Sequence, residues 1–335
     1  MRPMQQIARP LVLAAAALLF LGAASREADA QTKFRFGHDQ PVGSMYDEGH
    51  QALKRLVADK TGGKVQVDVF PAAQLGSEVA MIEGVRIGSV DGAVIHVANA
   101  STVIPELAIF SVSYLFKDLD HFERVVNDPK FQERIESLVA GKNLGLKVIG
   151  YYSAGVRNLY TRKGPAQSPE DLKGTKVRVM NNPIEAKIWS TIGTIPTPMN
   201  FGEVYQSLQT GVLDAAENAL SVIESNRHYE AAKTIILTEH QRSLSLLFIN
   251  ERKLKTLAAD QQDAFLAAAR EASAHERKRD AVLNEEAVDR MKQKGTQFVV
   301  PDRAKFAALI MPIQEEVAQN LKVMDILQLV RSHAK

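Results

Sequence analysis

One stretch of 37 residues, from Ala258 to Lys294, contains neither glycine nor proline, and it constrains the fold more than any other feature of the chain. Gly295 follows it, where a helix C-terminal cap is expected. As one helix the stretch would extend roughly 55 Å, which exceeds the width of a small domain. Either the helix breaks near Ser273, or it crosses between two lobes. The charged run from His275 to Asp280 is expected to be a solvated helix face.

The first thirty residues predict export. Arg2 and Arg9 give a positively charged start, and an apolar run from Leu11 to Ala24 follows. That run is shorter than the about 20 residues that a membrane-spanning helix needs. A small-residue cleavage site ends at Ala30, so we expect a signal peptide over residues 1–30 and a periplasmic mature chain. The absence of cysteine excludes a lipoprotein anchor.

The composition of the mature chain excludes several partners. Without the leader, 38 basic and 37 acidic side chains remain, with no charge block and no basic stripe. Nucleic acid and anionic membrane are therefore poor candidates. The remaining length is enough for two domains and for a large core without disulfides.

Strand-like and helix-like patterns alternate along the chain, which indicates α/β layers. Apolar runs and period-two alternation predict strands at 34–37, 65–69, 92–97, 146–151, 176–180, 234–238 and 244–250. Helices are predicted at 46–60, 77–87, 122–139 and 182–189, with a further helix start at Ser168-Pro169.

Patterns that indicate catalysis are missing from the sequence. The chain has no cysteine nucleophile, no HExxH, no G-x-S-x-G and no glycine-rich phosphate loop, and its eight histidines lack metal-ligand spacing. We therefore expect no metal, no cofactor and no enzymatic activity.

Polar residues at the ends of predicted strands are the candidate binding residues, because ligands of open α/β sheets lie beyond the carboxyl ends of strands. Two arginines could hold a carboxylate through their planar forks. For each candidate, a structural ion pair or an exposed position is the alternative. The set comprises Arg178, Arg157, His38, Asp39, His96 and Asn99.

Four segments then suggest a family. Leu172 to Val179 resembles the "LKGLKIRV" segment of solute-binding proteins of tripartite ATP-independent periplasmic (TRAP) transporters, of the C4-dicarboxylate and sialic-acid receptor type. Pro196 to Tyr205 resembles their "PTPMAFSEVY", and Ser207 to Asn218 resembles "ALQTGVVDGQEN". Upstream, Phe70 to Gly76 resembles "YPSSQLG". The resemblance runs in the same order from about Phe34 to the C-terminus.

The resemblance implies an α/β two-lobe periplasmic-binding-protein fold with crossover strands and a long bridging helix. It implies that Arg178 forms the main salt bridge to a ligand carboxylate, that Arg157 and Asn218 contact the same group, and that Phe201 packs on the ligand body. Asn181 is expected nearby, and Thr238 to His240 resembles a "TxH" segment that brings His240 into the set. Asp39, His96 and Asn99 stand where relatives carry ligand-selecting side chains.

Departures from the family's sequence pattern narrow the range of possible ligands. His96 stands where sialic-acid receptors carry an acid, and Asn99 where they carry a basic residue, so a sialic acid is disfavoured. A sugar acid, such as a uronate, or a dicarboxylate remains. We expect a first lobe of residues 31–154 plus 243–282 and a second lobe of residues 155–242 plus 283–335.

The resulting prediction is a monomeric receptor that delivers an organic acid to the membrane subunits of a TRAP transporter. A receptor for an ABC transporter and a periplasmic enzyme on the same scaffold are the alternatives.

Overall fold

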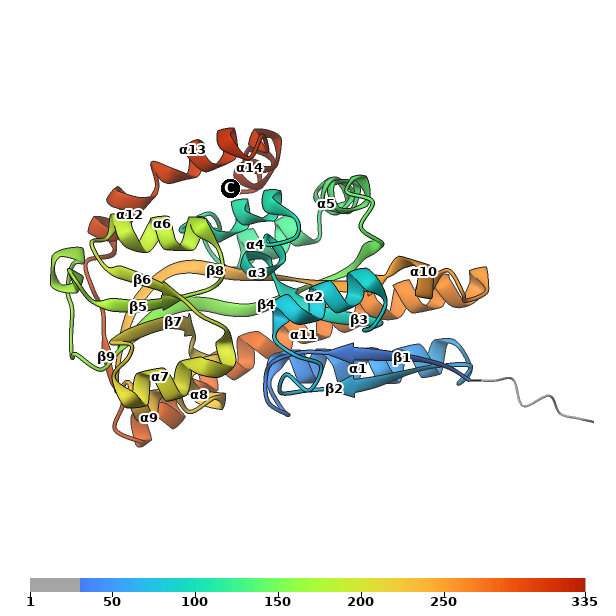
Figure 1. The fold of residues 1–335 in the computed structure, drawn as a ribbon, viewed down its shortest axis with the longest axis horizontal. Helices are drawn as coiled ribbons and strands as arrows, with labels where there is room; N and C mark the ends of the chain where they lie inside the picture. Colours follow the sequence, from blue (N-terminus) through green and yellow to red (C-terminus); the bar gives the residue numbers. More distant parts are fainter. Residues whose placement is uncertain (1–30, 335) are drawn as a thin grey trace, which may run out of the picture.

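The structure is a computed structural model that describes residues 31–334, and the predicted signal peptide lies outside this range. The described residues form one mixed sheet of nine strands in the order β2-β1-β3-β8-β4-β7-β5-β6, with β9 paired to β8 (Figure 1). The strands are β1 (Thr32–Gly37), β2 (Val65–Phe70), β3 (Gly92–His96), β4 (Leu146–Thr161), β5 (Lys176–Val179), β6 (Ile195–Pro198), β7 (Ala215–Ala219), β8 (Thr234–Asn250) and β9 (Gln297–Val299).

Helices pack around this sheet (Figure 1). The α-helices are α1 (Met45–Lys60), α2 (Glu78–Ile87), α3 (Val97–Ala100), α4 (Leu119–Val126), α5 (Pro129–Gly141), α6 (Pro183–Thr191), α7 (Val204–Thr210), α8 (Leu220–Ser225), α9 (His228–Ala231), α10 (Glu251–Leu254), α11 (Ala259–Gln293), α12 (Arg303–Ile310), α13 (Ile313–Asn320) and α14 (Met324–Ser332). Short 3₁₀ helices are η1 (Pro105–Ser111), η2 (Pro169–Leu172) and η3 (Phe201–Glu203).

Side-chain caps explain where several helices begin. Ser77 caps α2, and the Asn182 side chain accepts the backbone N–H of Ile184 at 2.7 Å at the start of α6. The single helix predicted at 122–139 is wrong. Asp128 caps a new helix and Pro129, which cannot donate a backbone hydrogen bond, occupies its first turn, so α4 and α5 are separate.

Two long strands join the two lobes. β4 and β8 pair antiparallel along their length, with three register shifts in β4, at Val148/Gly150, Ser153/Val156 and Arg157/Leu159. We call the side of this pair that carries β3, β1 and β2 the first lobe and the side that carries β7, β5 and β6 the second lobe. The prediction of two strands at 234–238 and 244–250 is wrong, because Gln241 and Arg242 between them still pair with β4. The irregularity at Glu239, which has a φ of 43°, does not end the strand.

The long helix is one element, and the predicted α/β two-lobe fold with crossover strands and a bridging helix is confirmed. α11 has 35 residues and contacts α1 of the first lobe, β4, and α8 of the second lobe (Figure 1). The prediction of a solvated face at 275–280 is wrong in part. Glu276, Arg277 and Asp280 are buried, because this part of α11 packs against β4.

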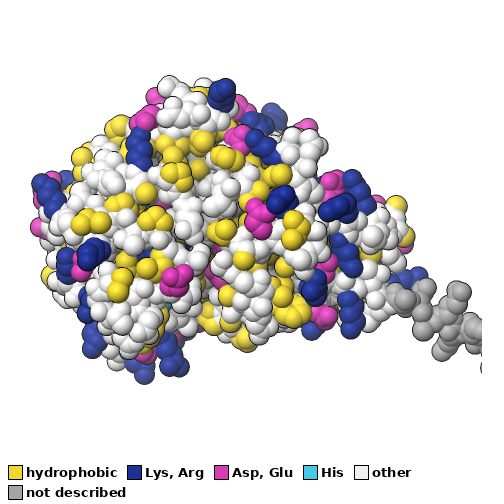
Figure 2. Space-filling view, in the orientation of Figure 1, with side chains coloured by type: hydrophobic (Ala, Val, Ile, Leu, Met, Phe, Trp, Pro, Cys, Tyr) yellow, Lys and Arg dark blue, Asp and Glu magenta, His cyan; other side chains and the backbone are white. Residues whose placement is uncertain are grey.

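The C-terminal helices connect back to the first lobe. α14 contacts α5, and Gln314 of α13 donates to the backbone carbonyl of Ser113 at 2.7 Å. Basic, acidic and hydrophobic side chains are interspersed on the face seen in Figure 2. From residue 31 to residue 334, no helix combines the length and apolar character needed to cross a membrane.

Candidate functional site

A polar pocket lies where the two lobes meet. Three adjacent strands of the second-lobe side, β4, β7 and β5, each contribute a polar side chain to it, and the first lobe closes the other side. The free space in the pocket is only about 30 Å³, little more than a water molecule needs. The lining residues are Asp39, Gln40, Met45, Tyr46, Glu78, His96, Asn99, Ala154, Arg157, Arg178, Met180, Phe201, Asn218 and Val222.

Arg178 on β5 is a buried cation without a paired carboxylate. Its side chain is 2% exposed, and its Nε and Nη2 groups donate to the backbone carbonyl of Met199 at 2.9 and 2.7 Å. None of the described acidic residues forms a salt bridge with it. Burial lowers the pKa of Arg178, and its guanidinium lies 5.9 Å from the ring centre of Phe201. Three of the five guanidinium N–H groups remain for an anion.

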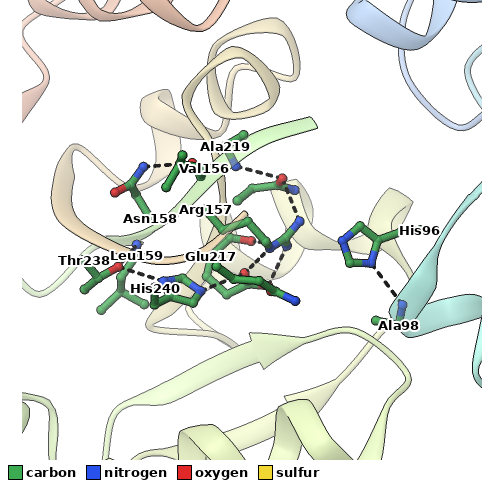
Figure 3. A network of polar contacts seen from close by, with 12 residues as sticks. His96, Ala98, Val156, Arg157, Asn158, Leu159, Glu217, Ala219, Thr238 and His240 are labelled. Carbon is green, nitrogen blue, oxygen red and sulfur yellow. Dashed lines mark hydrogen bonds and ion pairs between the residues drawn. The ribbon is translucent and has the colours of Figure 1, made fainter. Parts of the chain in front are cut away.

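Arg157 on β4 is equally buried but is already paired. Its Nε and Nη2 groups donate to the two carboxylate oxygens of Glu217, the Nη2 bond measuring 2.7 Å, and Nη2 also donates to the backbone carbonyl of Glu217 (Figure 3). Burial has the largest single effect on the pKa of Glu217 and raises it, but the charge and hydrogen bonds of Arg157 together with those of His240 outweigh burial, so the net shift is downward. The pair is therefore close to neutral, and Arg157 retains one free Nη1 hydrogen.

This pair orients Asn218 on β7. The Asn218 Oδ1 atom accepts hydrogen bonds from Arg157 Nη1 at 3.1 Å and from the backbone N–H of Ala219 at 2.9 Å. Since the oxygen is engaged, the Nδ2 amide is left to donate elsewhere. With Arg178, the second-lobe side of the pocket presents hydrogen-bond donors and one uncompensated positive charge.

The first-lobe side carries acceptors. Glu78, in the first turn of α2, accepts the backbone N–H of His96 at 3.1 Å and the Nδ2 amide of Asn99 at 2.7 Å, both through Oε2. Burial, followed by the charge of Asp39, raises the pKa of Glu78. Burial also raises the pKa of Asp39. Burial lowers the pKa of His96 to about 3, so this imidazole is neutral.

Seven sequence-predicted residues line the pocket: Asp39, His96, Asn99, Arg157, Arg178, Phe201 and Asn218. Three lie elsewhere. His38 is fully buried 3.6 Å from Asp47. Asn181 donates to Asn200 at 3.1 Å.

His240 is the third residue outside the lining, and it lies behind the Arg157–Glu217 pair. Its Nε2 atom is 3.3 Å from Glu217, and its Nδ1 atom is 2.8 Å from the Thr238 hydroxyl (Figure 3).

Sequence reasoning missed Glu78, Tyr46, Gln40 and the counterion Glu217. Glu78 follows a capping serine, so it reads as an ordinary first-turn acid that faces solvent. Glu217 stands in an alanine-rich strand, where a lone acid beside Asn218 was the available signal.

Comparisons with known proteins identify a family. Residues 36–320 match the model of the bacterial extracellular solute-binding protein family 7 (DctP). The 2,3-diketo-L-gulonate-binding periplasmic protein YiaO of Escherichia coli K12 is 33% identical over 291 residues, covering 86% of this chain and 87% of its own.

Two solved structures with similar folds hold uronates. A TRAP periplasmic solute-binding protein from Sulfitobacter sp. NAS-14.1 with bound β-D-galacturonate is 29% identical, covering 90% of this chain and 100% of its own, with a TM-score of 0.85. The corresponding protein from Chromohalobacter salexigens DSM 3043 with bound D-glucuronate is 30% identical, covering 90% and 99%, with a TM-score of 0.84. By the extent of the match to its model, the chain belongs to the bacterial extracellular solute-binding protein family 7.

Proposed function

We propose that this protein is the periplasmic receptor of a TRAP transporter and that it captures a sugar-acid anion between its lobes. The observation that carries the proposal is the buried, unpaired guanidinium of Arg178. A buried charge is stable only when it is compensated, and a ligand carboxylate supplies both the charge and the acceptor atoms. The uronates in two related structures support a sugar acid as that ligand.

The binding residues have separate roles in this proposal. Arg178 forms the salt bridge, while Asn218 and the remaining Nη1 hydrogen of Arg157 donate to the same carboxylate. Phe201 packs on the ligand body, and Asp39, His96 and Asn99 contact its far end. His38, Asn181 and His240 support the site from outside the lining.

The lobes would close over the ligand. We assign residues 31–154 plus 243–282 to the first lobe and 155–242 plus 283–335 to the second, with α13 and α14 reaching back onto the first. Contacts from both lobes to one ligand favour the closed state.

Delivery and localisation complete the proposal. The signal peptide is removed after Ala30, the monomeric receptor works in the periplasm, and the membrane subunits of the transporter accept the ligand. Neighbouring genes for a large and a small integral membrane protein without an ATPase would support this partner, whereas an ATPase gene would favour an ABC transporter. Mass spectrometry of the exported protein should give a chain that begins at Gln31.

Calorimetric titration tests the binding step. D-galacturonate should bind and D-galactose, which lacks the carboxylate, should not. Ligand at 100 times its dissociation constant should add about 2.7 kcal/mol of stability in thermal unfolding. Binding of neutral sugars with no response to any acid would contradict the proposed function.

A further inference from the structure

A second, larger pocket lies between the lobes and adjoins the candidate site. We call it the outer pocket; residues 72–77 of the first lobe and residues 200–205 of the second face each other across it. Its volume is about 450 Å³, against about 30 Å³ for the inner pocket around Arg178. Asp39 and Phe201 line both pockets. A substituent on a ligand in the inner pocket would therefore enter the outer pocket past these two side chains.

An aromatic surface on the second lobe forms one wall of the outer pocket. The ring centroids of Phe201 and His228 are 5.3 Å apart, and that of Tyr205 is 6.3 Å from His228. Burial lowers the pKa of His228 to about 3, so its ring is uncharged. The face of an aromatic ring is negative, and the C–H groups of a pyranose ring are slightly positive. A sugar ring can therefore pack on this wall.

Two amides add hydrogen-bonding groups of both kinds to the outer pocket. The Oδ1 atom of Asn200 accepts the Nδ2 amide of Asn181 at 3.1 Å, so the Nδ2 amide of Asn200 is left to donate. The Nδ2 amide of Asn226 donates to Gln40 at 3.0 Å, so the Oδ1 atom of Asn226 is left to accept. A sugar hydroxyl both donates and accepts, so it matches either amide.

The charges of the outer pocket favour an uncharged sugar. Among the described residues that line it, none is lysine or arginine, and the acidic side chains are Asp39 and Glu203. A carboxylate in the outer pocket would lose hydration without gaining a cation, in contrast to a carboxylate beside Arg178. The unit that fits the outer pocket is therefore a neutral sugar.

The first-lobe wall of the outer pocket is held in an unusual backbone conformation. Ala72 and Ala73 have φ angles of 51° and 58°, in the left-handed region that alanine rarely adopts. Their N–H groups donate to the backbone carbonyls of Gln40 and His38 at 2.8 and 3.0 Å. Such conformations persist where surrounding contacts impose them, and they are concentrated at ligand clamps. The wall is therefore fixed before a ligand binds.

We propose, on the basis of the proposed function, that the outer pocket is a subsite for a neutral sugar linked to the captured sugar acid, so that the receptor binds acidic disaccharides. The carboxylate of the acidic unit binds Arg178, and the glycosidic bond passes Asp39. The neutral unit packs on Tyr205 and exchanges hydrogen bonds with Asn200 and Asn226.

Two ligands that share the acidic unit test the subsite. One is D-glucuronate, and the other is the disaccharide in which D-glucuronate is β-linked to the primary hydroxyl of D-galactose. In calorimetric titration, the disaccharide should bind at least about fivefold more tightly. Tyr205→Ala should reduce this ratio at least about threefold and leave the affinity for D-glucuronate within about twofold of wild type. Tyr205→Phe keeps the ring and should preserve the ratio.

Tyr229→Ala is the matched control, since Tyr229 belongs to the same lobe, is also half-buried and does not line the outer pocket. It should leave the ratio unchanged. No preference for the disaccharide in the wild type, or a ratio that Tyr205→Ala leaves unchanged in a folded protein, overturns the subsite while capture of a sugar acid stands. If no sugar acid binds the wild-type protein, the proposed function and this inference fall together.

Discussion

Asn226 donates a hydrogen bond from Nδ2 to the Oε1 atom of Gln40 at 3.0 Å, and this contact joins the second lobe to the first. Asn226 is the C-cap of α8, and Gln40 follows β1. The other end of the Gln40 amide donates to Asp39, which lines the pocket. One side chain therefore connects the binding pocket to the contact between the lobes.

We expect Asn226→Ala to weaken the closed state. Loss of one neutral hydrogen bond costs about 1 kcal/mol, or roughly fivefold in affinity. The effect should fall on the dissociation rate of D-galacturonate, because the contact forms as the lobes close. Stopped-flow kinetics would measure it, with the exposed Asn320→Ala as control. A slower association rate with unchanged dissociation would contradict this role.

Arg178→Ala should abolish tight binding without destabilising the unliganded protein. Removing one partner of a buried charge pair costs about 2–5 kcal/mol of binding, so affinity for D-galacturonate should fall at least roughly 30-fold. Arg178→Lys should rescue poorly, because an ammonium lacks the planar fork. Titration and thermal unfolding of each variant measure the two effects. A large fall in the unliganded melting temperature would instead indicate a structural role.

Arg157→Ala should behave differently because Arg157 is paired. The substitution leaves Glu217 buried without its cation, which typically costs about 3–5 kcal/mol of folding stability. Replacing both residues by methionine should restore much of the stability but not the affinity. Urea unfolding of the single and double variants would measure this. A stable Arg157→Ala protein would show that the pair contributes little.

Asp280 should make stability depend on pH. Burial raises its pKa from 3.8 to about 6, so the folded protein holds this proton more tightly than the unfolded chain does. The contribution of Asp280 to folding stability is most favourable below pH 4, where the group is protonated in both states, and is lost as the pH rises through 6. As the pH rises from 4 to 7, the folding stability of Asp280→Asn relative to wild type should therefore increase by up to about 3 kcal/mol.

Urea unfolding at the two pH values would measure the gain. Asp289→Asn, an exposed position on the same helix, is the control and should show no such change. A constant difference between Asp280→Asn and wild type at both pH values would contradict the shift.

Ligand binding should bring the lobes together. A pocket of about 30 Å³ cannot admit a sugar acid unless its walls separate first. The chain has no cysteine, so labels can be placed at Val42→Cys and Val212→Cys, two exposed positions in different lobes. Pulsed electron paramagnetic resonance should show shorter distances with D-galacturonate. Val42→Cys with Ile87→Cys, within the first lobe, should not change, and an unchanged distance across the lobes would contradict closure.

The local pattern of the sequence determined much of the fold. The uninterrupted stretch before Gly295 predicted helix, since helix formation depends on neighbouring residues and on the absence of breakers, while a break near Ser273 remained open until the family resemblance implied one bridging helix. Period-two alternation located β2, and the cap at Asn182 located α6. The segments that resemble the family predicted that Arg178 and Asn218 share one pocket, and the structure places both in its lining.

Tertiary structure alone decided which charges are paired. Arg157 and Arg178 look alike in the sequence, yet only Arg157 meets a carboxylate, because pairing of β4 with β7 brings Glu217 beside it. Glu78 looks like an ordinary first-turn acid until packing of α2 on β3 turns it toward His96. Burial and partner choice depend on residues far apart in the chain, so the local pattern cannot encode them, whereas helix and strand formation depends on neighbours and can be predicted.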